Sequence, residues 1–366
     1  MRIGLLIYGS LDRLTGGFFY DRMLVEHLRR RGHEVEVVAL PMRSYPRALL
    51  DNLSESLLAR LTEPGFDLLL QDELTHPSCF RLNRRLRRTA GAPPIVAIIH
   101  LLRVSQPLPA WQRPLVRRVE GRYLASVDGL ILVNPQLRAC AARLAGVERP
   151  AVIAPPAGDH AAATTPLERI AARAREAGDL EIVFLGNLTP MKNLHMVLDA
   201  LARLGAGGWR LAVLGSLEAD PAYTRRLRRR IARAGLDGRV ALLGERPRAE
   251  VEERLAASHV LALPSAPESF GIAYLEAMRH GLPVVASSAS DTAANFSHGE
   301  TAFLVAPGDA DALAGHLRRL MEDRELLARM GVAARRWYES HPTWEESLER
   351  VHQFLLQLHA AKTESP

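Results

Sequence analysis

The chain has 366 residues, enough for two domains of ordinary size, each with its own core. Hydrophobic residues make up 48% and charged residues 24%, the balance of a globular protein, and no run of about 18 apolar residues predicts a transmembrane helix. The apolar run at residues 3–8 is too short for a signal peptide, so we expect a cytoplasmic protein. Two cysteines without metal-ligand spacing exclude a disulfide framework and a cysteine metal site.

Charge is distributed unevenly along the chain. Residues 1–160 contain 22 arginines and 15 acidic residues, whereas the remainder contains 25 basic and 26 acidic residues. A basic N-terminal half is suited to an anionic membrane surface or to an acidic acceptor. Lys192 and Lys362 are the only lysines, against 45 arginines, so a lysine within the folded body is conspicuous.

The first half alternates short apolar runs with longer amphipathic ones, a pattern that predicts βαβ units and a parallel sheet. We expect strands at residues 2–8, 34–40, 66–71, 94–99, 129–133 and 151–153. Helices are expected at about residues 17–31, 51–61, 77–89, 109–126 and 135–145.

The second half repeats this alternation. We expect strands at residues 181–185, 209–214, 239–243, 259–263 and 283–287, and helices near residues 193–204, 218–234, 248–257 and 269–280. From residue 309 onward the pattern is helical, and a last helix at about residues 344–359 has one apolar face.

Two doubly wound α/β domains follow from this order of elements. Prolines and alanines fill the stretch between the two halves, so we expect domains at residues 1–158 and 180–340, a linker at 159–179 and a C-terminal helical segment at 341–366 that packs back on the first domain. Ligands of such sheets bind at the carboxyl ends of the strands, so we look for functional residues in the loops after strands.

The segment at residues 264–278 follows an expected strand and opens a helix near Ser269. The backbone N–H groups from Ser269 to Ile272 would bind an anion, and Gly271 would let that anion approach closely. Glu276 lies about 8 Å further along the helix axis, the separation between the diphosphate and the ribose diol of a nucleotide. The alternative is a helix with an acid near its N-terminus and a solvated glutamate on its flank.

The same segment resembles the signature of the family 4 retaining glycosyltransferases. Its marks are two glutamates separated by seven residues, here Glu268 and Glu276, with Phe270-Gly271 after the first and Gly281-Leu282-Pro283 after the helix. The resemblance extends over essentially the whole chain and implies a GT-B fold, in which two Rossmann-like domains face each other across a cleft. It also implies donor contacts from the residues of this segment, namely Glu268, Ser269, Phe270, Gly271, Ile272 and Glu276.

A second match lies at Gly186-Asn187 and Lys192, directly after the first strand of the second domain. Members of the family usually have arginine at the position of Asn187, and that arginine and the lysine clamp the diphosphate of the donor. Asparagine brings no charge, so the resemblance implies a weaker clamp or one completed by another residue. A solvated loop lysine is the alternative for Lys192.

The first domain fits the resemblance less tightly. Gly16-Gly17 follows the first strand where the family has a glycine pair beside the phosphate and sugar of the donor, and the spacing is not that of a dinucleotide fingerprint. His100 ends the strand at 94–99, where the family commonly has a histidine near the anomeric carbon and the acceptor. A loop histidine without a role is the alternative.

Arginines cluster between residues 81 and 122, partly in an expected amphipathic helix. A solvated arginine-rich face is the simpler interpretation, but such a helix can also lie on an anionic membrane, so peripheral contact with the inner face of the membrane is a second hypothesis. Nothing in the sequence indicates a nucleic-acid partner.

The resemblance implies transfer of a hexose-type sugar, with retention, from a nucleotide-diphosphate donor to a glycan, lipid or small-molecule acceptor. Lys192, Glu268 and His100 are the expected catalytic residues. No Asp-x-Asp motif directly follows an expected strand, so we expect no essential metal and no cofactor. The alternatives are a catalytically idle nucleotide-sugar-binding protein and a nucleotide-sugar epimerase of the same fold.

Overall fold

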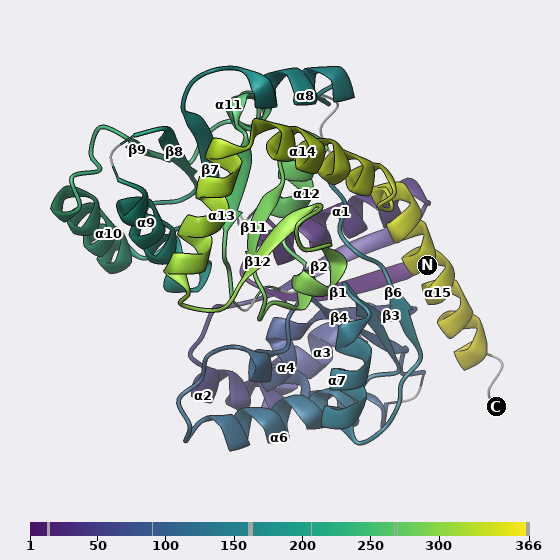
Figure 1. The fold of residues 1–366 in the computed structure, drawn as a ribbon. Helices are drawn as coiled ribbons and strands as arrows, with labels where there is room; N and C mark the ends of the chain where they lie inside the picture. The colour runs from purple at the N-terminus through teal and green to yellow at the C-terminus, as the bar shows by residue number, and fades with distance from the viewer. Residues whose placement is uncertain are drawn as a thin grey trace. The chain divides into compact units, whose positions relative to one another are not determined.

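The computed structural model describes residues 1–12, 15–89, 91–159, 164–205, 207–266, 268 and 270–363. The chain divides into two compact units, the first formed by Met1–Pro156 with Thr343–Pro366 and the second by Ala157–Pro342. Each unit contains one parallel six-stranded sheet with flanking helices (Figure 1), so the predicted pair of parallel α/β domains is confirmed. Among the described residues, no helix is long and apolar enough to cross a lipid bilayer.

The sheet of the first unit has the order β2-β1-β3-β4-β5-β6, and all its strands are parallel. The strands are β1 (Arg2–Tyr8), β2 (Glu34–Leu40), β3 (Leu68–Asp72), β4 (Ile95–Ile99), β5 (Gly129–Leu132) and β6 (Ala151–Ile153). β3 and β4 are buried along their whole length, because a parallel sheet is covered on both faces.

The helices of the first unit include the C-terminal one. They are α1 (Gly16–Arg30), α2 (Tyr45–Ala48), α3 (Glu55–Thr62), α4 (His76–Cys79), α5 (Leu82–Leu86), α6 (Arg113–Leu124), α7 (Gln136–Ala145) and α15 (Trp344–Thr363), with 3₁₀ turns η1 (Leu49–Leu53), η2 (Glu73–Thr75) and η3 (Arg103–Ser105). α15 packs against α1 and the edge strand β6 (Figure 1). Gly129, in the neighbouring strand β5, leaves room for α15, because a Cβ there would lie 2.6 Å from Leu358 Cδ1.

The sheet of the second unit has the order β12-β11-β10-β7-β8-β9, again all parallel. The strands are β7 (Leu180–Leu185), β8 (Trp209–Leu214), β9 (Val240–Gly244), β10 (Val260–Leu263), β11 (Val284–Ser287) and β12 (Ala302–Val305). β12, a four-residue edge strand that pairs with β11, was not predicted.

The helices of the second unit cover its sheet. They are α8 (Leu167–Arg175), α9 (Leu194–Leu204), α10 (Pro221–Arg233), α11 (Arg248–Ala257), α12 (Ile272–Arg279), α13 (Ala310–Glu322) and α14 (Arg324–Glu339), with 3₁₀ turns η4 (Pro190–Lys192) and η5 (Asp291–Asn295). α8 lies within residues 159–179, for which we expected a linker. It packs on α14 through Ile170, which the glycines Gly281 and Gly331 accommodate.

Candidate functional site

The loops after β7 and β10 meet at the point where the strand order of the second sheet reverses, because β7 has β8 on one side and β10 on the other. This is the switch point at which open α/β sheets bind ligands. Two hydrogen bonds tie the loops together: Asn193 Nδ2 donates to Pro264 O at 2.8 Å, and the Ala266 N–H donates to Met191 O at 3.1 Å. The loops therefore hold the side chains they carry in fixed relative positions.

Lys192 and Glu268 form an ion pair across these loops. Lys192 Nζ lies 2.6 Å from Glu268 Oε2, and the two side chains are 31% and 14% exposed. The stem of Lys192 crosses Gly186, where a Cβ would lie 3.7 Å from Lys192 Cδ. The structure thus brings together Gly186, Lys192 and Glu268, and it places a half-buried cation and a mostly buried carboxylate at the switch point.

Asn187 links the loop after β7 to the loop after β8. Its Oδ1 accepts a hydrogen bond from the Ser216 N–H at 3.0 Å. An amide oxygen suits this bond to the backbone, whereas the arginine usual in the family would bring a charge. Asn187 therefore leaves Lys192 as the charged group of the motif.

Helix α12 begins later than predicted, at Ile272 rather than near Ser269. Gly271 is the N-cap residue with φ of 76°, a left-handed conformation that cannot belong to a right-handed helix. A Cβ on Gly271 would lie 2.5 Å from Tyr274 Cδ2. Phe270 is buried against the ring of His341, at 5.3 Å between centroids, and Ser269 lies outside the described residues.

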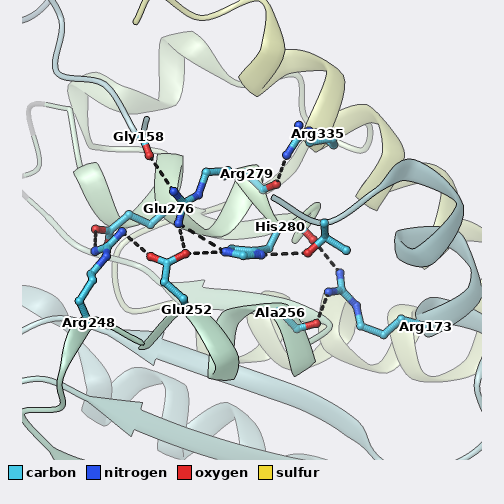
Figure 2. A network of polar contacts seen from close by, with 10 residues as sticks. Gly158, Arg173, Arg248, Glu252, Ala256, Glu276, Arg279, His280 and Arg335 are labelled. Atoms are coloured by element: carbon cyan, nitrogen blue, oxygen red, sulfur yellow. Dashed lines mark hydrogen bonds and ion pairs between the residues drawn. The ribbon is translucent and has the colours of Figure 1, made fainter. Parts of the chain in front are cut away.

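Glu276 lies in the middle of α12 and pairs with Arg248, the first residue of α11 (Figure 2). Arg248 Nη1 donates to Glu276 Oε1 at 2.5 Å, and Arg248 Nη2 lies 2.5 Å from Glu252 Oε1. One guanidinium therefore bridges two carboxylates, a geometry suited to its planar set of donors. The Glu276 side chain is 11% exposed and that of Arg248 is 40% exposed.

Glu252 joins this pair to the end of α12. Its Oε2 accepts hydrogen bonds from Arg279 and from His280 Nε2, the latter at 2.8 Å (Figure 2). Burial lowers the pKa of His280 to about 4, so its ring is neutral at pH 7. Because Nε2–H donates to Glu252, Nδ1 accepts from the Thr165 hydroxyl at 2.9 Å. The network fixes Arg248 and, through it, Glu276.

In the first unit, His100 follows β4 and contacts two buried carboxyl groups. His100 Nε2 lies 3.0 Å from Asp21 Oδ1 and 3.7 Å from Asp72 Oδ2. A neutral imidazole that donates Nε2–H to Asp21 has its lone pair on Nδ1. These three residues offer ligand atoms that all lie within 4.8 Å of one another, so their geometry would also admit a metal ion.

The carboxyl groups around His100 hold their protons at unusually high pH. Burial raises the pKa of Asp21 to about 7, although a hydrogen bond with Asp72 opposes the shift. Burial also raises the pKa of Asp72 well above its usual range and that of Glu73 to about 8.

The glycine pair lies at the start of α1, where Thr15 Oγ1 accepts the Phe18 N–H at 3.4 Å. A Cβ on Gly17 would lie 3.3 Å from His100 Cδ2, so this glycine leaves room for the imidazole. Glu73 accepts the His100 N–H at 2.8 Å. The structure thus brings Gly16, Gly17 and His100 together at the carboxyl ends of β1 and β4.

Two adjoining hollows on the first unit are lined by exposed arginines. They share Arg122 and Ala125, and the described residues that line them include no acidic one, although the lining residue Arg87 pairs with Asp128 at 2.7 Å. Nearby on the chain, Trp111 is 77% exposed and Leu115 is 46% exposed. The arginines that line the hollows are Arg81, Arg84, Arg87, Arg117, Arg118, Arg122 and Arg143.

Sequence reasoning missed the partners of the predicted residues. Asp72 ends β3 and Glu73 follows it, so this acidic pair at a sheet edge was available to sequence reasoning, but Asp21 lies on α1 and carries no such signal. Arg248 and Glu252 are spaced i,i+4 on α11, which indicates a pair on one helix face. Nothing in that spacing points to Glu276 on another helix.

Residues 168–337 match the family model described as Glycosyl transferases group 1. The D-inositol 3-phosphate glycosyltransferase of Corynebacterium efficiens is 32% identical over 157 residues, 42% of this chain and 37% of that protein. The 2-deoxystreptamine glucosyltransferase of Streptomyces kanamyceticus is 28% identical over 68% of this chain and 67% of its own length. Matches to the first three relatives cover 37%, 46% and 38% of their length, less than half of each.

Solved structures resemble the whole chain in fold. The sucrose-phosphate synthase of Thermosynechococcus elongatus has a TM-score of 0.78 at 23% identity, covering 98% of this chain and 99% of that one. Anabaena HepE, solved in complex with UDP, has a TM-score of 0.78 at 21% identity, covering 98% of this chain and all of its own. At these identities the likeness concerns the fold.

Proposed function

We propose that this chain is a group 1 glycosyltransferase that transfers a sugar from a nucleoside-diphosphate donor to an acceptor hydroxyl, because residues 168–337 match that family model and the chain has a GT-B fold. The observation that carries this proposal is the Lys192–Glu268 pair at the switch point of the second sheet, with Glu276 on the helix that follows. The Lys192 cation suits the diphosphate of the donor, the Glu268 carboxylate suits its sugar, and the Glu276 carboxylate suits its ribose.

The proposed chemistry proceeds with retention at the anomeric carbon of a hexose-type sugar. Lys192 Nζ takes up negative charge on the departing diphosphate as the bond to the sugar breaks. Glu268 accepts hydrogen bonds from sugar hydroxyls and also holds Lys192 in place. Glu276 accepts the ribose hydroxyls, with Arg248 orienting its carboxylate. No step assigned to these residues uses a metal ion, so we propose a reaction without an essential metal or cofactor.

His100 binds the sugar or the acceptor in this proposal. Its Nε2 is engaged by Asp21, so Nδ1 is the nitrogen that accepts a hydrogen bond from a substrate hydroxyl. Asp21 acts through His100 by fixing its tautomer and its orientation. Gly17 keeps the space beside the ring open.

Uridine is the first base to test. The solved HepE structures contain UDP and UDP-glucose, and their fold covers this chain almost completely. The named relatives glycosylate D-inositol 3-phosphate and 2-deoxystreptamine, so hydroxyls of polar rings are the first acceptors to offer.

The arginine hollows support peripheral contact with an anionic membrane on its inner face. The exposed arginines of the hollows, of which Arg87 pairs with Asp128, attract anionic headgroups, and exposed Trp111 suits the interface. In this proposal the membrane contact brings the enzyme to a lipid-linked acceptor.

The direct test of the function is NMR of a mixture of protein, UDP-sugar and candidate acceptor. We expect nucleoside diphosphate and a glycoside that keeps the anomeric configuration of the donor. An epimerase would convert the donor sugar without any acceptor, and an idle binding protein would leave the donor intact. An inverted glycoside would refute retention but not transfer.

A further inference from the structure

Three histidines and two glutamates meet where α15 packs against α1, within the first unit. His27 lies on α1, His33 in the turn before β2, and Glu345, Glu349 and His352 on α15. The two helices are more than 300 residues apart in the sequence, so any bond between these side chains closes a very long loop.

The ligand atoms have the spacing of a metal site. His27, Glu349 and His352 each offer a nitrogen or oxygen, and these atoms lie within 4.8 Å of one another. His27 Nε2 lies 3.4 Å from Glu349 Oε2, and His352 Nδ1 lies 3.4 Å from Glu349 Oε1. Bonds of about 2.0–2.1 Å from Zn²⁺ to nitrogen and oxygen, in a tetrahedron, place two ligands about 3.3–3.4 Å apart.

His27 is buried, and each of its ring nitrogens faces a carboxylate without making a regular hydrogen bond to it. Its side chain is 1% exposed, and neither Nδ1 nor Nε2 makes a hydrogen bond of acceptable geometry. A buried imidazole with two unsatisfied nitrogens is costly unless a further group completes it.

Outer partners orient both imidazoles. His27 Nδ1 lies 3.3 Å from Glu345 Oε2 while Nε2 faces Glu349, the arrangement of a carboxylate–histidine–metal relay. His352 Nε2 lies 2.9 Å from His33 Nε2, which leaves Nδ1 of His352 on the side of Glu349. The second nitrogen of His352 is therefore held by His33, and that of His27 faces Glu345.

We propose that His27, Glu349 and His352 bind a divalent transition metal, best matched by Zn²⁺, which clips α15 to α1. A water molecule completes the tetrahedron, since Glu349 is 32% exposed and His352 is 12% exposed. Arg31 Nη2 lies 2.7 Å from Glu349 Oε2, so its guanidinium and the metal ion compete for this carboxylate.

The test uses the full chain without an affinity tag, stripped of metal by a chelator and titrated with Zn²⁺ in competition with a chromogenic indicator. We expect one equivalent to bind and the melting temperature to rise with it. Co²⁺ in place of Zn²⁺ is expected to give the visible absorption of a tetrahedral site. His27→Ala and His352→Ala should each lose the bound equivalent, and Glu345→Gln should weaken binding by about 10- to 100-fold.

Two further variants separate this site from adventitious binding. Arg31→Ala removes the competing cation and should tighten binding. His298→Ala with His316→Ala, a histidine pair of the second unit with ring centroids 5.5 Å apart, should change nothing. Absence of a stoichiometric equivalent in the unmodified chain would overturn the proposal. The proposal would also be overturned if both His27→Ala and His352→Ala still bound one equivalent of Zn²⁺.

Discussion

Lys192 Nζ lies 2.6 Å from Glu268 Oε2, although the two residues are 76 positions apart in the chain. Both follow central strands of one parallel sheet, β7 and β10, and the order of that sheet reverses between β8 and β10. The pair therefore stands where such sheets bind ligands. It leaves the cation only partly neutralised, because 31% of the lysine side chain faces solvent and can meet a diphosphate.

Removing either member of this pair should slow turnover strongly. Lys192→Ala deletes the charge that stabilises the leaving diphosphate, and Glu268→Ala deletes both the sugar contact and the partner of Lys192, so each should cost more than about tenfold in kcat. Steady-state release of nucleoside diphosphate measures the effect. Lys362→Ala, at the only other lysine, is the matched control and should retain full activity.

Arg248 should affect donor binding through Glu276. Arg248→Ala frees the carboxylate to move, so we expect a raised KM for the donor with a smaller change in kcat, and Glu252→Gln should show a weaker version of the same effect. A nucleotide lacking the ribose 2′-hydroxyl isolates the contact. Discrimination against it should fall in Glu276→Ala and in Arg248→Ala alike.

Arg254→Ala on the same helix α11 serves as the control for this contact. If Arg248→Ala and the unmodified chain discriminated equally against the nucleotide without the 2′-hydroxyl, Arg248 would have no role in ribose binding. In that case the Arg248–Glu276 pair would only stabilise the packing of α11 on α12.

The stability of the first unit should depend on pH through Asp21. Its pKa of about 7 in the folded chain lies above the ordinary value of 3.8, so the folded state holds a proton that the unfolded chain has lost. The stabilising contribution of that proton is fully present below pH 3.8 and is lost as pH rises through 7. Asp21→Asn should therefore gain in melting temperature relative to the unmodified chain between pH 5 and 8.

Buried histidines such as His76, whose pKa burial lowers to about 4, make the stability of both proteins rise with pH. Comparing the melting temperatures of Asp21→Asn and the unmodified chain at each pH removes this opposite trend. A constant difference in melting temperature across this range would show that Asp21 is ionised in the folded chain. Differential scanning fluorimetry at matched ionic strength is sufficient for the comparison.

Gly271→Ala should destabilise the second unit. Its φ of 76° disfavours a side chain, and a Cβ would lie 2.5 Å from the buried ring of Tyr274, so a loss of roughly 1–3 kcal/mol is expected. Gly235→Ala, at φ of 66° with nothing within 4 Å of its Cβ, tests the backbone strain alone. Chemical denaturation should give Gly271→Ala the larger loss of the two.

The proposed membrane contact depends on the arginine hollows. Substituting Arg84, Arg117 and Arg118 with glutamine should reduce flotation with anionic vesicles at low salt, and raising the salt should have the same effect on the unmodified chain. Arg225, Arg228 and Arg229 on α10 are also exposed and provide a control with the same change of charge. Equal loss in both triple variants would indicate attraction by net charge alone.

Much of the fold could be predicted because strand and helix periods differ and parallel strands are continuous apolar runs. The bounds of β1, β2 and β6 were predicted to the residue. The start of α12 was placed too early because the residues just before it look helical in sequence. The positive φ of Gly271 keeps these residues out of the helix, which begins at Ile272. β12 was missed, and α8 was included in the expected linker because prolines and a run of alanines precede it in the sequence.

The candidate site was predictable only where residues follow strands. Gly186, Lys192, Glu268 and His100 lie in such loops, so their grouping follows from the order of the sheets. Arg248 and Asp21 lie on helices, and their pairing with Glu276 and His100 depends on the angle at which each helix packs. The sequence carries no record of that angle.

The most direct test of the central claim is a thermal-shift screen of the purified chain against UDP, GDP, ADP and their sugar conjugates. A ligand that binds only the folded state raises the melting temperature by mass action. The account predicts a clear rise with one nucleotide that is lost in Glu276→Ala. No rise with any of these nucleotides, or a rise that Glu276→Ala leaves unchanged, would contradict a nucleotide site at the loops of β7 and β10.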